Sequence, residues 1–185
     1  MKPSVQRWRE ELVDLHASNS FVVFLCGPTV EEAATKPSSA LRQKLWDELE
    51  GEGFEIVLGE DDGLENLRKQ FDGMAHENEL SFVKQESGAV VLIADSVGSF
   101  CELGLFAYTH YTENENQTDF ILILDEEFEK DVSYLNEGPK SAIELMGGKV
   151  FFGDFSKFDT VPIVNRLKRR RAVWFTHGKG RPKAK

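Results

Sequence analysis

The chain has few of the features that mark exported, membrane-spanning or metal-rich proteins. Only two cysteines, Cys26 and Cys101, occur among its 185 residues. They are too few for a disulfide framework, and neither has Cys or His neighbours at the spacing of a zinc site. The longest apolar runs, 21–26, 89–94 and 120–124, are too short to cross a bilayer, and polar residues stand where a secretory signal needs an apolar run. We therefore expect a cytoplasmic protein with reduced thiols, no membrane contact, no bound metal and no other cofactor.

Basic residues are scarce except at the C-terminal end. The formal net charge is −10, yet nine of the 22 Lys and Arg residues and none of the 32 Asp and Glu residues lie in 166–185. An acidic body repels nucleic acid, so any polyanion would have to be contacted through this tail. Two interpretations stay open: the tail binds nucleic acid or another partner, or it packs against the acidic body.

Apolar runs alternate with amphipathic segments along the whole chain. The runs predict strands at 21–26, 54–58, 89–94, 120–124 and 150–152. Helical spacing predicts helices at 4–17, 37–49, 99–111, 141–146 and 161–171, with two short helices within 61–85 on either side of Gly73. This alternation predicts a doubly wound α/β fold, flavodoxin-like or Rossmann-like, with a mainly parallel five-stranded sheet and helices on both faces. We divide the chain into a leading amphipathic helix (1–20), the α/β domain (21–165) and a basic helix end and tail (166–185).

The expected fold decides where a ligand would bind. In open α/β sheets, ligands bind beyond the carboxyl ends of the strands at the topological switch point, here between the first and third predicted strands. Two turns should meet there, and they supply our candidate substrate-binding residues: Cys26, Gly27, Pro28, Asp95, Ser96, Gly98 and Ser99. Gly98 is expected to form the turn, and helix-start N–H groups with the two hydroxyls could cradle a phosphate.

Glu102 is the candidate catalytic residue. A carboxylate beside a phosphate cradle could stabilise or trap the positive charge that develops on a sugar when its bond to a nucleobase breaks. If Glu102 stands in the first helical turn, the helix dipole favours its ionised form. The spacing Ser99-x-x-Glu102 also fits a capping box, in which the carboxylate serves only the helix end. Both interpretations stay open at this point.

The stretch from Ser96 to Gly104 resembles the motif of the nucleoside 2-deoxyribosyltransferase-like superfamily. Members carry Gly, a short gap and Glu-Leu-Gly after the third strand, and the resemblance implies that Glu102 is the nucleophile. The family position six residues before the nucleophile is Asp in transferases acting on nucleosides and Ser in hydrolases acting on nucleoside 5′-monophosphates. Ser96 stands there, which implies a 5′-phosphorylated substrate. Phe100 departs from the Gly that is common in the family.

The leaving-group acid is not assigned by the resemblance. The family uses acidic residues from the helical region between the second and third strands, where this chain offers Asp72, His76, Glu77 and Glu79. The stretch that ends at Cys101-Glu102 is also similar to the catalytic stretch of Toll/interleukin-receptor-like NAD hydrolases, so NAD stays open as a substrate.

The combination of Phe-Leu-Cys-Gly at 24–27, Glu79-Leu80 and the Gly98 to Gly104 stretch resembles the deoxyribosyltransferase-like effectors of bacterial retrons. Such effectors are anti-phage toxins kept silent by the reverse transcriptase and its hybrid RNA–DNA. The resemblance implies an N-glycosidase acting on a nucleoside 5′-monophosphate or NAD, working as a homo-oligomer, with nucleic acid or a reverse transcriptase as a partner of tail 166–185. The alternatives are a non-catalytic nucleotide sensor and an interaction protein on the same fold.

Overall fold

A five-stranded parallel sheet forms the centre of the protein. The computed structural model describes residues 3–60, 74–113, 118–130, 132–177 and 181–182. The strands run in the order β3-β2-β4-β5-β6, with every neighbouring pair parallel. Their bounds are Val22–Cys26 (β2), Glu55–Val57 (β3), Ser87–Ala94 (β4), Asp119–Leu124 (β5) and Lys149–Phe152 (β6). This is the predicted doubly wound fold, and the adjacent strands β2 and β4 flank the switch point as expected.

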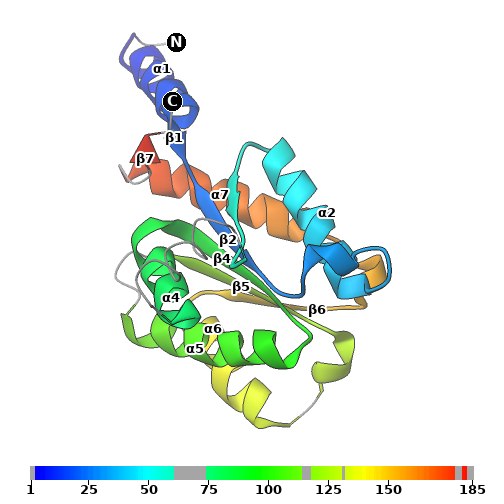
Figure 1. Cartoon of the computed structure of the whole chain (residues 1–185). Helices are drawn as coiled ribbons and strands as arrows, with labels where there is room; N and C mark the ends of the chain where they lie inside the picture. The colour runs from blue at the N-terminus through cyan, green and yellow to red at the C-terminus, as the bar shows by residue number, and fades with distance from the viewer. Residues whose placement is uncertain (1–2, 61–73, 114–117, 131, 178–180, 183–185) are drawn as a thin grey trace.

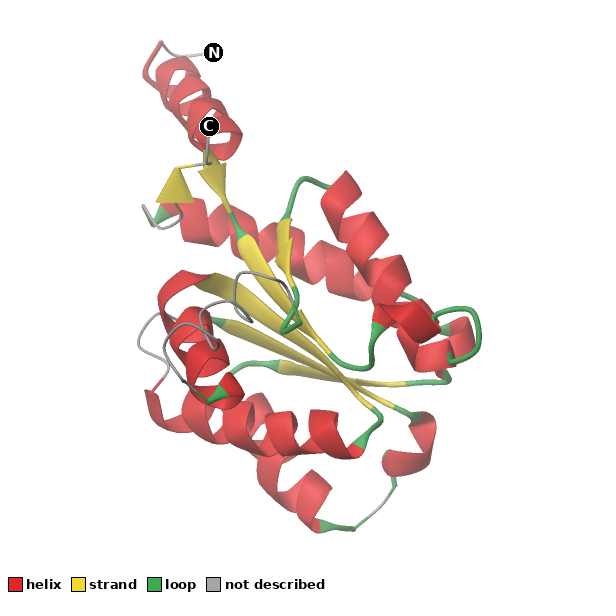
Figure 2. Cartoon of the chain, viewed as in Figure 1, coloured by secondary structure: helices red, strands yellow, loops and turns green. Residues whose placement is uncertain are grey.

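Helices cover both faces of the sheet (Figure 2). One face carries α2 (Pro37–Gly51) and α7 (Val161–Thr176), and the other carries α4 (Ala75–Glu86), α5 (Val97–Glu113) and α6 (Ser141–Leu145). Alternation along each strand divides the core between the two layers: Val23 and Leu25 of β2 pack with α2 and α7, whereas Phe24 and Cys26 pack with α5. The three inner strands β2, β4 and β5 are thus buried at every position, which is why their sequences are largely apolar runs.

Helical bounds agree with the prediction in most places. The first of the two short helices expected within 61–85, together with Gly73, falls outside the described residues, and α4 stands where the second was expected. Short helical turns fill several connections: η1 (Val30–Glu32), η2 (Glu126–Phe128), the π-helical η3 (Asn136–Lys140) and η4 (Phe155–Lys157). Helix α7 extends past the expected end at 171, because Phe175 is buried and Trp174 packs edge-on against Phe21 at 5.7 Å.

The leading helix stands apart from the sheet. Helix α1 (Pro3–Ser18) projects from the body in Figure 1 and is followed by β1 (Asn19–Ser20), which pairs antiparallel with β7 (Arg181–Pro182). Its Trp8 is 56% exposed. Of the helices in the described part of the chain, none combines the length and the apolar character needed to cross a membrane.

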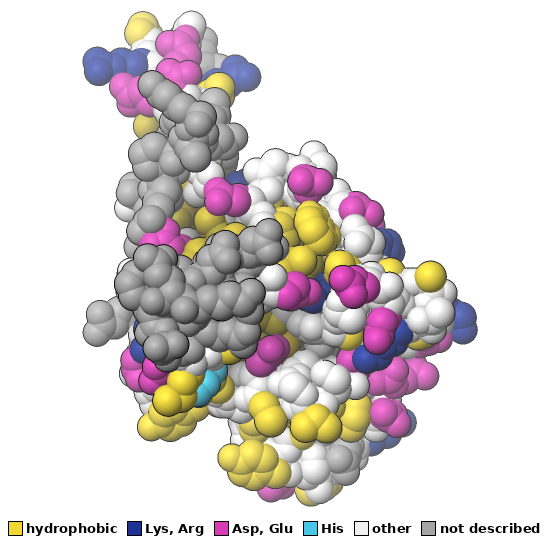
Figure 3. Space-filling view, in the orientation of Figure 1, with side chains coloured by type: hydrophobic (Ala, Val, Ile, Leu, Met, Phe, Trp, Pro, Cys, Tyr) yellow, Lys and Arg dark blue, Asp and Glu magenta, His cyan; other side chains and the backbone are white. Residues whose placement is uncertain are grey.

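Several basic residues of α7 contact the acidic body. Arg166 makes a two-pronged contact with the buried Asp119, at 2.6 and 2.8 Å. Lys168 reaches Glu52 at 2.7 Å, and the Arg171 guanidinium lies 4.0 Å from the centre of a Phe ring at position 54. Acidic side chains are spread over the face of the body drawn in Figure 3. Part of the basic segment therefore serves the packing of the C-terminal helix.

Candidate functional site

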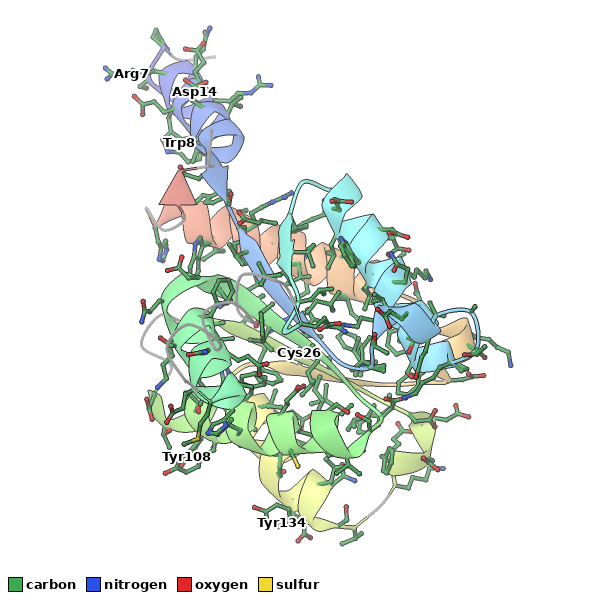
Figure 4. The ribbon with its side chains drawn as sticks, viewed as in Figure 1. Arg7, Trp8, Asp14, Cys26, Tyr108 and Tyr134 are labelled. Atoms are coloured by element: carbon green, nitrogen blue, oxygen red, sulfur yellow. The ribbon has the colours of Figure 1, made fainter. Side chains whose placement is uncertain are left out.

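The turn after β2 lies where the neighbouring strands β2 and β4 end. Figure 4 places Cys26 at the end of β2, in the middle of the molecule. Gly27 follows with φ +142°, and a methyl group on its Cα would lie 2.9 Å from the Ile93 carbonyl oxygen of β4. Because L-residues rarely adopt this backbone conformation and the space is already taken, only glycine fits here. The turn is therefore held close against the adjacent strand.

Arg42 fixes this turn from the α2 side. Its side chain is 1% exposed and donates to the Leu25 carbonyl at 2.6 Å and to the Pro28 carbonyl at 3.0 Å. The same guanidinium forms a two-pronged ion pair with Glu60, at 2.5 and 2.9 Å. A planar donor fork can satisfy a carboxylate and two carbonyls at once, which an ammonium cannot do with the same geometry. Arg42 thus brings a permanent positive charge to the carboxyl end of β2.

Two glutamates reach the same region from the opposite layer. Glu79 lies on α4 and Glu102 on α5. One turn further along each helix, Phe82 and Phe106 pack against the Phe24 ring, with ring centres 5.8 and 6.1 Å away. Since residues three or four apart share one side of a helix, this shared aromatic contact directs both carboxylates toward the end of β2. A methyl group on Gly59, just past β3, would lie 3.0 Å from Glu79 Oε1.

Burial and charge set the ionisation of the two glutamates. Burial, followed by repulsion from Glu102 and Glu60, raises the pKa of Glu79 to about 7. Burial also raises the pKa of Glu102, but the guanidinium of Arg42 opposes that rise. Near neutral pH, Glu79 is therefore the better proton carrier, and Glu102 has the nearby cation that favours a carboxylate.

The Cys26 thiol lies within the same electrostatic environment. Burial raises its pKa well above the usual value, and repulsion from Glu102, Glu79 and Glu60 adds to the rise. A thiol held neutral in this way is a packing group rather than a nucleophile. Within the described ranges, no three His, Cys, Asp or Glu side chains are grouped closely enough to hold a metal ion.

Helix α5 begins earlier than expected, and this changes the roles expected for Gly98, Ser99 and Glu102. The helix starts at Val97, so Gly98 is a helical residue and not a turn glycine. Ser96 caps the helix: its hydroxyl accepts from the Ser99 N–H at 3.2 Å, and the Ser99 hydroxyl accepts from the Ser96 N–H at 2.9 Å. The reciprocal cap is therefore Ser96 with Ser99, and the expected Ser99–Glu102 capping box is wrong.

This shift releases Glu102 from a role in capping. The residue lies in the second turn of α5, where the helix dipole has largely lost its effect. The expected place of Glu102 in the first helical turn is therefore wrong. Burial raises its pKa, and the positive charge of Arg42 lowers it. Glu102 remains partly exposed.

Asp95 connects the end of β4 to the start of α2. It accepts a short hydrogen bond from Ser38 Oγ, and Lys36 Nζ lies 3.1 Å from one of its carboxylate oxygens. Its backbone N–H donates to the Ser99 hydroxyl at 3.0 Å. Asp95 therefore braces the strand end against the starts of two helices.

The predicted site residues lie at the carboxyl ends of β2 and β4. Two charged residues of the site were not predicted from the sequence. The two predicted turns, Cys26 to Pro28 and Asp95 to Glu102, follow the paired strands β2 and β4. Of the open candidates for the acid, His76 and Glu77 are exposed, Glu79 is partly buried, and Asp72 lies outside the described residues. Arg42 and Glu60 were missed. Arg42 could have been noticed, because it shares a helical side with the buried Leu45 and Leu49, where an unpaired charge would be costly.

The fold and site define a doubly wound α/β protein with a charged site at its switch point. A family model described as STM3845 retron effector protein matches residues 38–175. The chain belongs to this family, which indicates a bacterial anti-phage effector. No curated protein matches the chain.

Proposed function

We propose that the protein is an N-glycosidase that hydrolyses the bond between base and sugar in a nucleoside 5′-monophosphate or NAD. The observation that carries the proposal is the pair Glu79 and Glu102, brought from two helices to one strand end with different influences on their pKa values. Carboxyl pairs whose environments differ in this way divide the roles of acid and nucleophile in glycoside hydrolysis. The resemblance of the Ser96 to Gly104 stretch to deoxyribosyltransferase-like enzymes gives the same role to Glu102.

The reaction would proceed in two displacements. With a nucleoside 5′-monophosphate, a Glu102 carboxylate oxygen attacks the anomeric carbon, the carbon–nitrogen bond breaks, and its electron pair leaves with the base as Glu79 gives that base a proton. The nicotinamide of NAD is cationic and leaves as a neutral molecule without a proton, so with NAD Glu79 starts ionised and hands the proton that it takes from water to the solvent. Water then attacks the anomeric carbon and loses a proton to Glu79, and the bond to Glu102 breaks to restore its carboxylate. Each side chain ends in its starting protonation state.

The phosphate or sugar hydroxyls would bind at the start of α5. Val97 and Gly98 in the first helical turn are exposed residues, and N–H groups at a helix start favour an anion. The hydroxyls of Ser96 and Ser99 already bond to each other at 3.0 Å, so their contribution is to hold the helix start in place. Cys26, Gly27 and Pro28 would form the floor beneath the sugar, and Asp95 would brace that floor through Lys36 and Ser38.

Base release from a panel of nucleoside 5′-monophosphates and NAD, followed by chromatography, tests the proposal. The parent should release free base from at least one member, and Glu102→Gln should lose at least about 100-fold in rate because a neutral amide is a poor nucleophile. Glu77→Gln is the matched control: it makes the same change on the exposed side of α4 and should keep the parental rate. Parental turnover by Glu102→Gln would refute the assignment. Nucleotide binding without base release by the parent would favour the sensor instead.

Glu79→Gln tests the acid separately. Loss of a general acid costs about 10²- to 10⁴-fold with a base that must be protonated. A 4-nitrophenyl leaving group needs no proton, so Glu79→Gln should release the first equivalent of 4-nitrophenolate from the corresponding riboside 5′-phosphate at a rate near that of the parent, although later turnovers slow because the variant lacks the base for water. A loss in this first turnover equal to the loss with the natural base would show that Glu79 is not the acid.

A further inference from the structure

A cavity lies between α4 and α5, away from the helix residues that carry Glu79 and Glu102. It has a volume of about 280 Å³ and is lined by Leu80, Val83 and Lys84 of α4, by Phe106, Thr109, His110, Thr112 and Glu113 of α5, and by Val90, Thr118 and Phe120 beneath them. Val90 and Phe120 are register partners near the starts of β4 and β5. The cavity is therefore separate from the carboxylates at the strand ends.

Its walls combine apolar and polar groups in a definite arrangement. The floor and sides are aliphatic and aromatic, and the rings of His110 and Phe120 meet edge to face with centres 5.5 Å apart. At the rim, Lys84 and Glu113 form an ion pair of 2.5 Å that links α4 to α5. Apolar walls with a few polar groups at one side are typical of sites for small organic ligands.

We propose that this cavity binds a planar heteroaromatic ring of one or two fused rings, as in a free nucleobase. Flat apolar faces would lie against Val90 and the edges of Phe106 and Phe120, because aromatic rings favour edge-to-face contacts. Polar ring atoms would face the rim, where Thr109, Lys84 and Glu113 can exchange hydrogen bonds. A protein cavity of about 150 Å³ can bind benzene, so this larger volume accommodates a bicyclic ring.

The position of the cavity also couples it to the carboxylate pair. Leu80 directly follows Glu79, and Phe106 lies one turn after Glu102, so both helices that carry the carboxylates line the cavity. A ring bound between them would fix how the two helices pack on each other, and with that the spacing of the two carboxylates. This coupling rests on the proposed function. If it holds, a released base that binds in the cavity would inhibit further base release.

Methyl-detected NMR tests binding without any need for turnover. Adenine and benzimidazole are the probes, and cyclohexylmethanol is the non-aromatic control. The aromatic probes should shift the methyl resonances of Leu80, Val83 and Val90 and give NOEs from ring protons to those methyl groups, whereas the control should do neither. Absence of these shifts and NOEs with both aromatic probes would overturn the proposal.

Two substitutions on α5 locate the binding. Thr109→Trp fills the cavity from the partly exposed side of the helix and should abolish the shifts, whereas Tyr108→Trp, at a neighbouring position that is 66% exposed and does not line the cavity, should keep them. Unchanged binding by a folded Thr109→Trp protein would place the ring elsewhere and refute the assignment; if that variant does not fold, the NOEs in the parent decide.

The coupling has its own readout. Saturating ring ligand should lower base release at least five-fold in the parent and in Tyr108→Trp. Binding with unchanged turnover would refute the coupling alone. A parent that binds the ring but releases base from no substrate would refute the proposed function and leave the binding site intact.

Discussion

Replacing Arg42 with Met tests whether this buried guanidinium holds the site together. The substitution keeps most of the side-chain volume but removes the donors to the carbonyls of Leu25 and Pro28. Each buried carbonyl left without a partner costs about 1–3 kcal/mol. Glu60, whose side chain is 48% exposed, can regain water and adds little. We expect the free energy of unfolding to fall by about 2–6 kcal/mol, the cost of the two carbonyls together.

Urea denaturation measures this loss. With a slope of about 1–3 kcal/mol per molar urea, the midpoint should fall by roughly 2 M. Lys44→Met is the matched control on the same helix: its ion pair with Glu48 spans 3.9 Å and both side chains are exposed, so it should cost about 1 kcal/mol or less. Equal midpoints for the two variants would refute the role given to Arg42. NMR titration of Glu102 in the Arg42→Met protein should show a pKa above the parental value, because the group that lowers it is gone.

Three further changes probe the same framework. Gly27→Ala should lower the unfolding midpoint sharply, because φ +142° and a methyl contact of 2.9 Å with the Ile93 carbonyl oxygen both oppose it; Gly51→Ala, with nothing within 4 Å of the added methyl, is the control, and equal midpoints would contradict the geometry. Asp119→Asn should destabilise the fold by about 3 kcal/mol in urea, since Arg166 loses the partner of a buried charge pair, and an unchanged midpoint would show that the pair contributes nothing net. Glu79→Gln should alter the pH dependence of stability. The pKa of Glu79 is raised from 4.5 to about 7 in the folded protein, so the parent loses stability as the pH rises from 4.5 to 7. The variant should lack this slope and should be the more stable protein at pH 8.

The layout of the fold could be predicted because apolar runs carry the signal directly. Val22 to Cys26 and Ser87 to Ala94 are buried along their whole length, and strands of this kind separated by amphipathic helices permit few other architectures. The start of α5 was misplaced because both Ser96 and Ser99 are good capping residues. The predicted start was Ser99, whereas the helix begins at Val97, next to the reciprocal hydrogen bonds of these two serines.

The charges of the site could not be predicted in the same way. Glu79 and Glu102 are 23 positions apart in the sequence, yet their charges repel each other in the fold, where Phe82 and Phe106 pack on the same ring, that of Phe24. Arg42 reaches the site from the opposite layer; its place beside Leu45 and Leu49 marks it as buried, but no spacing within α2 reveals which groups it contacts. Contacts of this kind depend on tertiary packing, for which a single sequence contains no periodic signal.

The ionisation of Glu102 therefore depends on both layers of the fold. Helix α5 supplies the carboxyl group, but the dipole at its start acts weakly on the second turn, and burial by itself raises the pKa. The opposing positive charge comes from Arg42, which is held in place by the carbonyls of Leu25 and Pro28 and by Glu60 beyond β3. A change that loosens α2 from the sheet would then raise the pKa of Glu102 without moving α5 at all. Under the proposed function, a smaller fraction of the nucleophile would then be ionised, so catalysis by Glu102 depends on contacts made in both layers.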